Sequence, residues 1–155
     1  MNKLVIASLP RSASAWLTTA LNACTCLRAS HELLSKIHRG EQTWEHWDVS
    51  VGSDATVPDH QHIPEGAKTM FLWRKPDDCM ASLMKMGVFD YNHWVSQRAW
   101  AANYIELYKP LFLAYDDLGG AVQRIAQKMG VKCDKVILKE MLDMRITSKL
   151  YKDSV

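Results

Sequence analysis

The 155-residue sequence lacks the long apolar runs and the charged blocks that mark several classes of protein. No stretch approaches the roughly 18 apolar residues that a membrane-spanning helix needs. No run of about five like charges offers a basic arm for nucleic acid, and the net charge is only +2. With 48% hydrophobic and 23% charged residues, the composition is that of an ordinary globular protein. We therefore expect neither a membrane span nor a nucleic-acid partner.

Cysteine is also scarce, and its spacing argues against two common uses. The four cysteines show neither a disulfide framework nor the paired C-x-x-C spacing that is usual in zinc sites. The apolar start at Met1–Ile6 is interrupted by Arg11 before it reaches the length of a secretory leader, so it predicts a buried strand. We expect reduced thiols, no bound metal and a cytoplasmic location.

One unit, a short apolar strand followed by a polar loop and a helix, occurs three times. The chain has the length of a single domain, over 1–155, and contains no internal repeat or linker. The predicted strands are Lys3–Ser8, Thr69–Trp73 and Pro110–Tyr115, and the helices that follow them are Ser14–Ala23, Asp77–Met86 and Leu118–Met129. We also expect helices over Trp94–Tyr108 and Lys132–Met144, a short strand within Val51–Val57 and a fraying tail over Arg145–Val155.

Alternating strands and helices predict an α/β domain with a mainly parallel central sheet. In sheets of this kind, crossover connections are right-handed and ligands bind beyond the carboxyl ends of the strands. The loops at 9–15, 74–76 and 116–117 should therefore lie on one edge of the sheet. Three polar loops then converge on a candidate site.

The first of these loops has the composition of an anion site. Backbone N–H groups at the start of a helix lack helical partners, and the helix dipole favours negative charge there. Arg11 adds a guanidinium, Ser12 and Ser14 add hydroxyl groups, and Ala13 and Ala15 leave room for a phosphate near the backbone. A capped helix beside a solvated arginine would show the same residues. The loop alone leaves both interpretations open.

The loop is not a Walker A motif, because Ala13-Ser14-Ala15 lacks the lysine and the metal-binding hydroxyl of that motif. A Mg-ATP kinase is therefore disfavoured. PRSASAWL at Pro10–Leu17 instead resembles the 5′-phosphosulfate loop of sulfotransferases, which reads approximately Pro-Lys/Arg-Ser-Gly-Thr-Thr-Trp-Leu.

Two further segments resemble the same family, in the same order along the chain. FLWRKPDDCMAS carries Arg74, Pro76, Asp78 and Ser82 at the spacing of the family's 3′-phosphate signature, Arg-Asn-Pro-x-Asp-x-x-x-Ser. FLAYDDL at Phe112–Leu118 is similar to the family's Tyr-Glu-Asp-Leu at the end of a strand. A pairing of Arg74 with the neighbouring aspartates is the alternative explanation of the second segment.

The resemblance implies a three-layer P-loop NTPase-like fold and a specific reaction. Sulfotransferases move a sulfuryl group from 3′-phosphoadenosine 5′-phosphosulfate (PAPS) to an acceptor hydroxyl or amine, without a metal ion. The residues that would hold the 5′-phosphosulfate are Arg11, Ser12, Ala13, Ser14, Ala15 and Trp16. Arg11 takes the place of the family's catalytic lysine or arginine, while Arg74 and Ser82 would hold the 3′-phosphate.

An acceptor hydroxyl also needs a general base. The position of the base in one branch of the family falls on Glu32, and the adjacent His31 matches the histidine that serves in another branch. A carboxylate at a helix start after Ser30 would explain Glu32 equally well. His60, His62 and Asp54 are weaker candidates for the base.

The sequence departs from the family pattern at several places. Ala13 stands where the family has glycine, and Ala15 where it has threonine. The family's Arg-Lys-Gly-x-x-Gly loop has no counterpart here, so Arg145, Lys149 and Lys152, or a second subunit in a homo-oligomer, are the candidates to replace it. The acceptor, a small molecule or a peptide, is not indicated. A divergent P-loop nucleotide or nucleoside kinase and a non-catalytic nucleotide-binding module remain the alternative functions.

Overall fold

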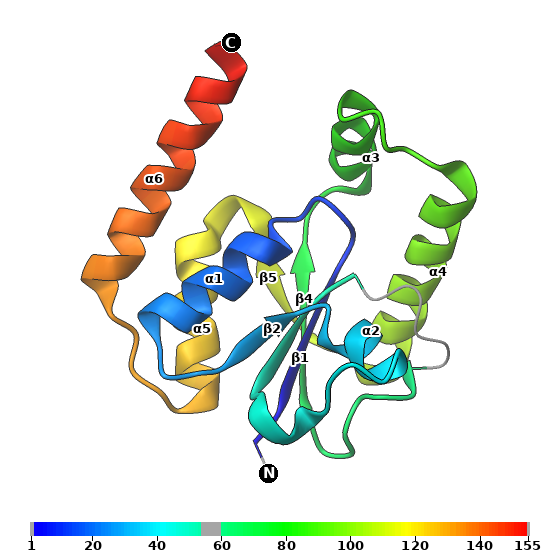
Figure 1. The fold of residues 1–155 in the computed structure, drawn as a ribbon, viewed down its shortest axis with the longest axis vertical. Coiled ribbons are helices and arrows are strands. Elements are labelled where there is room, and N and C mark those ends of the chain that lie inside the picture. The colour runs from blue at the N-terminus through cyan, green and yellow to red at the C-terminus, as the bar shows by residue number, and fades with distance from the viewer. Residues whose placement is uncertain (1, 54–59, 155) are drawn as a thin grey trace.

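Five parallel strands form the centre of the molecule, in the order β2-β3-β1-β4-β5 (Figure 1). The computed structural model describes residues 2–53 and 60–154, with side chains described up to Arg145. The strands are β1 (Leu4–Ser8), β2 (Ala29–His31), β3 (Val49–Gly52), β4 (Lys68–Trp73) and β5 (Leu111–Ala114). The predicted, mainly parallel sheet is confirmed.

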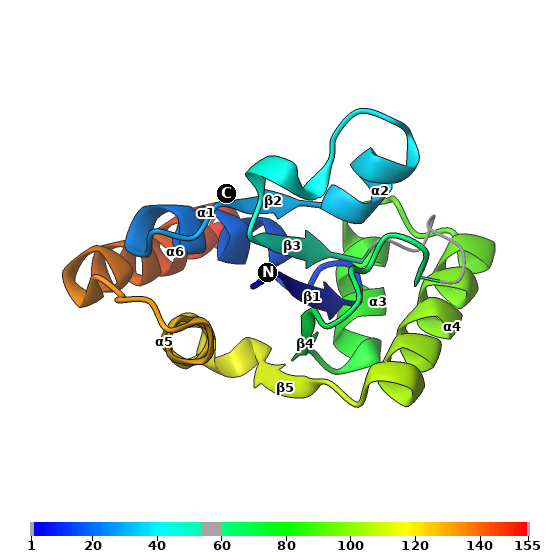
Figure 2. The same cartoon turned by 90° about the horizontal axis from the view of Figure 1, so that it is seen from below.

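Helices cover both faces of this sheet and complete a three-layer α/β fold (Figure 2). One face carries α1 (Ser14–Cys24), α5 (Leu118–Met129) and α6 (Lys135–Ser154), and the other carries α2 (Leu33–His38), α3 (Pro76–Lys85) and α4 (Tyr91–Tyr108). Two 3₁₀ turns, η1 (Trp44–His46) and η3 (Tyr115–Asp117), lie in the connections. The arrangement is consistent with a P-loop-like fold.

The central strand β1 is buried along its whole length, which explains its apolar sequence from Leu4 to Ala7. Leu4 and Ile6 pack into the core cluster beneath α1 and α5, whereas Val5 and Ala7 pack into the cluster beneath α3 and α4. All five residues of β1 are buried. A strand that is covered on both faces has no polar side, so it shows a continuous apolar run rather than an alternating pattern.

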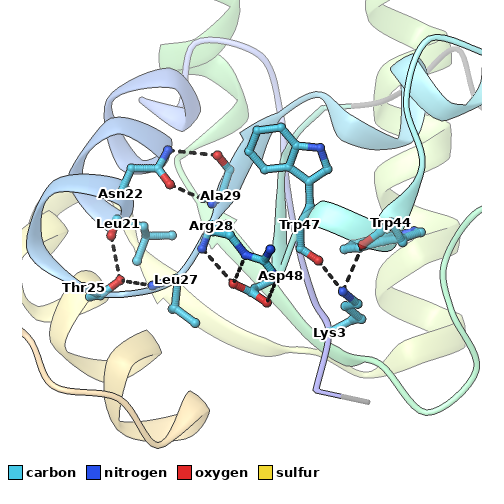
Figure 3. Close-up of polar contacts among 10 residues, drawn as sticks. All are labelled: Lys3, Leu21, Asn22, Thr25, Leu27, Arg28, Ala29, Trp44, Trp47 and Asp48. Atoms are coloured by element: carbon cyan, nitrogen blue, oxygen red, sulfur yellow. Dashed lines mark hydrogen bonds and ion pairs between the residues drawn. The ribbon is translucent and has the colours of Figure 1, made fainter.

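Polar contacts hold the amino-terminal edge of the sheet together (Figure 3). Lys3 is only 8% exposed, and its ammonium donates to the main-chain carbonyls of Trp44 and Trp47. Arg28 pairs with Asp48, with 3.3 Å between Nε and Oδ2. Burial alone would raise the pKa of Asp48, but the hydrogen bonds and charge of Arg28 hold it below its ordinary value. Structural ion pairing thus lies at the edge opposite the predicted site.

The predicted elements differ from the observed ones mainly in the less regular segments. The three strand-loop-helix units begin and end within about two residues of the predicted bounds. The last helix, however, begins at Lys135, where the Asp134 carboxylate accepts hydrogen bonds from the next N–H groups, and it continues to Ser154. The helix predicted over Lys132–Met144 therefore begins later and extends further than predicted, through most of the tail expected to fray. The strand predicted within Val51–Val57 is β3, which ends at Gly52, and residues 54–57 lie outside the described residues.

No described helix combines the length and the apolar character that a bilayer crossing requires.

Candidate functional site

The candidate site lies at the carboxyl ends of β1 and β4, two neighbouring strands from which the chain leaves in opposite directions. After β1 it passes through α1 toward β2, and after β4 it passes through α3 and α4 toward β5. In an open parallel sheet, such a change of direction leaves a crevice beyond the strand ends, where ligands bind. The loops that follow these two strands carry Arg11 and Arg74.

The loop after β1 turns sharply into α1, and two of its non-glycine residues adopt the left-handed conformation. The φ angles of Arg11 and Ala13 are 64° and 65°. This conformation costs an alanine about 1–2 kcal/mol. Ala13 is also the residue before α1, and its side chain makes no capping hydrogen bond. The first N–H groups of α1 therefore face the loop without a side-chain cap from that position, as an anion site requires.

The hydroxyl of Ser12 does not lie at the anion site, where it was predicted. Its side chain is fully buried, and Oγ lies 3.5 Å from the Sγ atom of Cys79 in α3. The hydroxyl thus holds the loop against α3 rather than pointing to the crevice. Burial raises the pKa of the Cys79 thiol, although the hydrogen bond with Ser12 and the charge of Arg74 oppose this shift. Trp16 is half-buried and packs against the core cluster beneath α1.

Two arginines join the loop after β1 to the segment after β4. The Nε atom of Arg11 donates to Oγ of Ser82 over 3.2 Å, and Nη1 of Arg74 donates to the main-chain carbonyl of Arg11 over 2.5 Å. Within the described part of the chain, no ion pair links either arginine to a carboxylate. The alternative pairing of Arg74 with Asp77 or Asp78 is therefore not observed.

The third predicted segment reaches the same place. The ring centroid of Tyr115, which follows β5, lies 4.2 Å from Cζ of Arg74. Of the two aspartates that come next, Asp117 caps α5 by accepting a hydrogen bond from the N–H of Gly120. The three polar loops therefore lie on one edge of the sheet, as predicted, with Asp117 in a structural role.

The two candidates for the general base lie beside the loop but make different contacts. Nε2 of His31, at the end of β2, lies 3.0 Å from Oγ of Ser14, and it lies 3.7 Å from Oε1 of Glu32. The carboxylate of Glu32 turns toward β3, where Oε1 accepts a hydrogen bond from the N–H of Ser53 over 3.0 Å. A Cβ atom at Gly52 would lie 2.5 Å from Cδ of Glu32, so a larger residue there would displace this carboxylate from its present position. Glu32 precedes α2 with a φ of 56° and is not within a helix.

The weaker base candidates do not join this group. His60 is buried and packs against the rings of Trp100 and Tyr104. His62 lies beside His38, with 3.1 Å between Nε2 and Nδ1. Asp54 lies outside the described residues.

All four cysteines are free thiols, and the described residues contain no group of three or more His, Cys, Asp or Glu side chains that could hold a metal ion. Comparison with family models, curated proteins and solved structures finds no match to this chain. The case for a function therefore depends on the site's own geometry.

Proposed function

We propose that the protein is a sulfotransferase that moves a sulfuryl group from PAPS to an acceptor hydroxyl or amine. One observation carries the proposal: the two segments that resemble the family's phosphate-binding motifs are in direct contact. Arg11 and Ser82 are 71 residues apart in the sequence, yet Nε and Oγ lie within hydrogen-bond distance. Their meeting at a change of chain direction supports one ligand with two separate anionic groups.

The charge around the loop also fits such a ligand. Arg11 and Arg74 are not neutralised by any described carboxylate. Guanidinium groups bind phosphate and sulfate oxygens through paired, charge-assisted hydrogen bonds. The left-handed conformation of Ala13 supports the resemblance further, because the family has glycine at this position and glycine adopts it without strain.

The residues of this chain would act mainly by positioning and by stabilising charge. The acceptor oxygen or nitrogen forms a bond to sulfur while the bond from sulfur to the 5′-phosphate oxygen breaks. Arg11 and the first N–H groups of α1 would stabilise the negative charge that develops on the leaving phosphate. We assign the removal of the acceptor's proton to His31, because it contacts the loop through Ser14. Glu32, held by Ser53, would orient the imidazole.

Calorimetry with 3′-phosphoadenosine 5′-phosphate, the product of the donor, tests this function. We expect the intact protein to bind it, and Arg74→Ala to weaken binding about tenfold or more because a charge-assisted hydrogen bond is lost. Arg124→Ala is the matched control, since it removes the same charge from the exposed face of α5. A folded protein that does not bind the nucleotide, or an Arg74→Ala variant that matches the control, would refute the proposal.

A divergent nucleotide kinase is the second candidate, because the parallel sheet and the helix start after β1 would serve ATP as well. Stabilisation by Mg-ATP, without stabilisation by 3′-phosphoadenosine 5′-phosphate, would favour it. Binding of the latter nucleotide without turnover over a broad acceptor panel would favour the non-catalytic module. With four free thiols, a reducing compartment such as the cytoplasm suits the proposed enzyme.

A further inference from the structure

The Tyr115 ring contacts two guanidinium groups that come from different parts of the chain. The ring centroid lies 4.2 Å from Cζ of Arg74 and 5.4 Å from Cζ of Arg145. Nη2 of Arg145 also donates a hydrogen bond to the Tyr115 hydroxyl over 3.1 Å. The separation between Cζ of Arg74 and Cζ of Arg145 is therefore no greater than the sum of these two distances.

Arg145 comes from α6, which lies outside every segment that resembles a known motif. In Figure 1 the carboxyl-terminal half of α6 rises beyond the carboxyl ends of the strands, on the same edge as the loop that follows β1. The side chain of Arg145 is half-buried against Tyr115 rather than extended into solvent. The last helix thus brings a third guanidinium toward the edge where Arg11 and Arg74 already lie.

This cluster carries positive charge without an internal counterion. Among the described residues, no ion pair joins Arg11, Arg74 or Arg145 to a carboxylate. Arg28 and Arg39, by contrast, pair with Asp48 and Glu41. Like charges repel, so an anion that contacts both Arg74 and Arg145 would be bound more tightly than an anion at a single arginine.

We propose that Arg145 is a phosphate-binding residue, which shares one phosphate monoester of the ligand with Arg74, and that Tyr115 positions both guanidinium groups. A phosphate dianion offers oxygens to two planar donors at once, which a single carboxylate does less well. The assignment of this group as the 3′-phosphate of the nucleotide rests on the proposed function. The binding of an anion between Arg74 and Arg145 does not depend on the proposed function.

The test compares Arg145→Gln with Arg124→Gln, a control that loses the same charge from α5. Calorimetry measures three ligands: 3′-phosphoadenosine 5′-phosphate, 5′-AMP and pyrophosphate. We expect Arg145→Gln to bind the first about tenfold or more weakly, and to bind 5′-AMP, which lacks the 3′-phosphate, within about twofold of the control. Arg145→Lys should recover part of the affinity, because it keeps the charge but not the planar donor set.

The outcomes separate this inference from the proposed function. If Arg145→Gln binds the first ligand and pyrophosphate as well as the control does, the role of Arg145 is refuted and the proposed function is untouched. If the intact protein shows no preference for 3′-phosphoadenosine 5′-phosphate over 5′-AMP, while Arg145→Gln loses affinity for pyrophosphate, the two-arginine site stands and the proposed function fails. An intact protein that binds none of the three ligands refutes both.

Discussion

Tyr104 shows how a single buried polar group can join two layers of this fold. Tyr104 belongs to α4. Its hydroxyl donates toward the main-chain carbonyls of Val5 and Met70, each 3.0 Å away, on the adjacent strands β1 and β4. The side chain is fully buried. Burial raises the pKa of Tyr104 well above its ordinary value, because the phenolate would lose its hydration.

We expect Tyr104 to make the free energy of unfolding depend on pH in the alkaline range. The unfolded chain loses the phenol proton near pH 10, whereas the folded protein keeps it, so the contribution is full below about pH 10 and is lost as the pH rises further. Tyr104→Phe should cost about 1–2 kcal/mol at pH 7, and this cost should shrink above pH 10. Urea unfolding of the intact protein and of Tyr104→Phe, at pH 7 and above pH 10, measures this cost. Tyr91→Phe, at an exposed position, is the control; an equal pH response in both variants would contradict the assignment.

The side chains of the predicted site residues differ in what they contact. Arg11, Arg74 and Ser82 meet one another, and Ser14 meets His31. The Ser12 hydroxyl, by contrast, turns inward to Cys79. A motif fixes the spacing of residues along the chain, but it does not say which hydroxyl of a tight loop faces the core. That choice depends on the helix packed behind the loop.

Among the strands, β2 is the one that sequence patterns could not reveal, and the short helix α2 was not predicted either. It has only three residues, Ala29–His31, and it follows α1 after a short turn. So short a segment shows neither alternation nor an apolar run. Its position comes from tertiary contacts: β3 pairs with one side, and Asn22 of α1 forms two hydrogen bonds with Ala29 on the other. The strands β1, β4 and β5 were predicted because each contains a run of at least four mostly apolar residues.

Asn22 should therefore matter more than its exposed position suggests. Its side chain accepts from the N–H of Ala29 and donates to the C=O of the same residue, at 2.8 and 2.9 Å (Figure 3). These bonds satisfy groups on the open edge of the sheet. We expect Asn22→Ala to lower the free energy of unfolding by about 1–2 kcal/mol, measured by urea denaturation. Asn103→Ala, at an exposed position on α4, should change it by less than about 0.5 kcal/mol. Equal effects of the two changes would show that the edge contact adds nothing.

For the whole molecule, the order of strands explains why the sequence could locate the site but not complete it. Apolar strands followed by polar loops predict a parallel sheet, and a parallel sheet places those loops on one edge. This reasoning brought the loops of Arg11 and Arg74 together with the segment that follows β5, where Tyr115 contacts Arg74. It named Arg145 only as one of three candidates, with Lys149 and Lys152, to replace the missing loop. It could not choose among them, because the path of α6 after the last strand depends on how α5 and α6 pack against α1. No motif encodes that packing.

The site is built from elements that lie far apart in the sequence, so a ligand bound there should stabilise the entire fold. Arg74, just before α3, contacts both the loop before α1, at Arg11, and the residue after β5, Tyr115. Arg11 also contacts Ser82 of α3. A ligand that binds only the folded state adds about 2.7 kcal/mol at one hundred times its Kd. For a domain of this size, the midpoint of thermal unfolding should rise by about 5–10 °C.

Thermal unfolding with and without 3′-phosphoadenosine 5′-phosphate measures this shift. We expect one cooperative transition that moves as a unit, because the two core clusters share the central sheet. At the same ligand concentration Arg74→Gln should lose most of the shift, whereas Arg124→Gln should keep it. Two transitions, of which the ligand moves only one, would contradict a single domain over 1–155. They would mean that the layer of α5 and α6 unfolds independently of the sheet edge that holds Arg11 and Arg74.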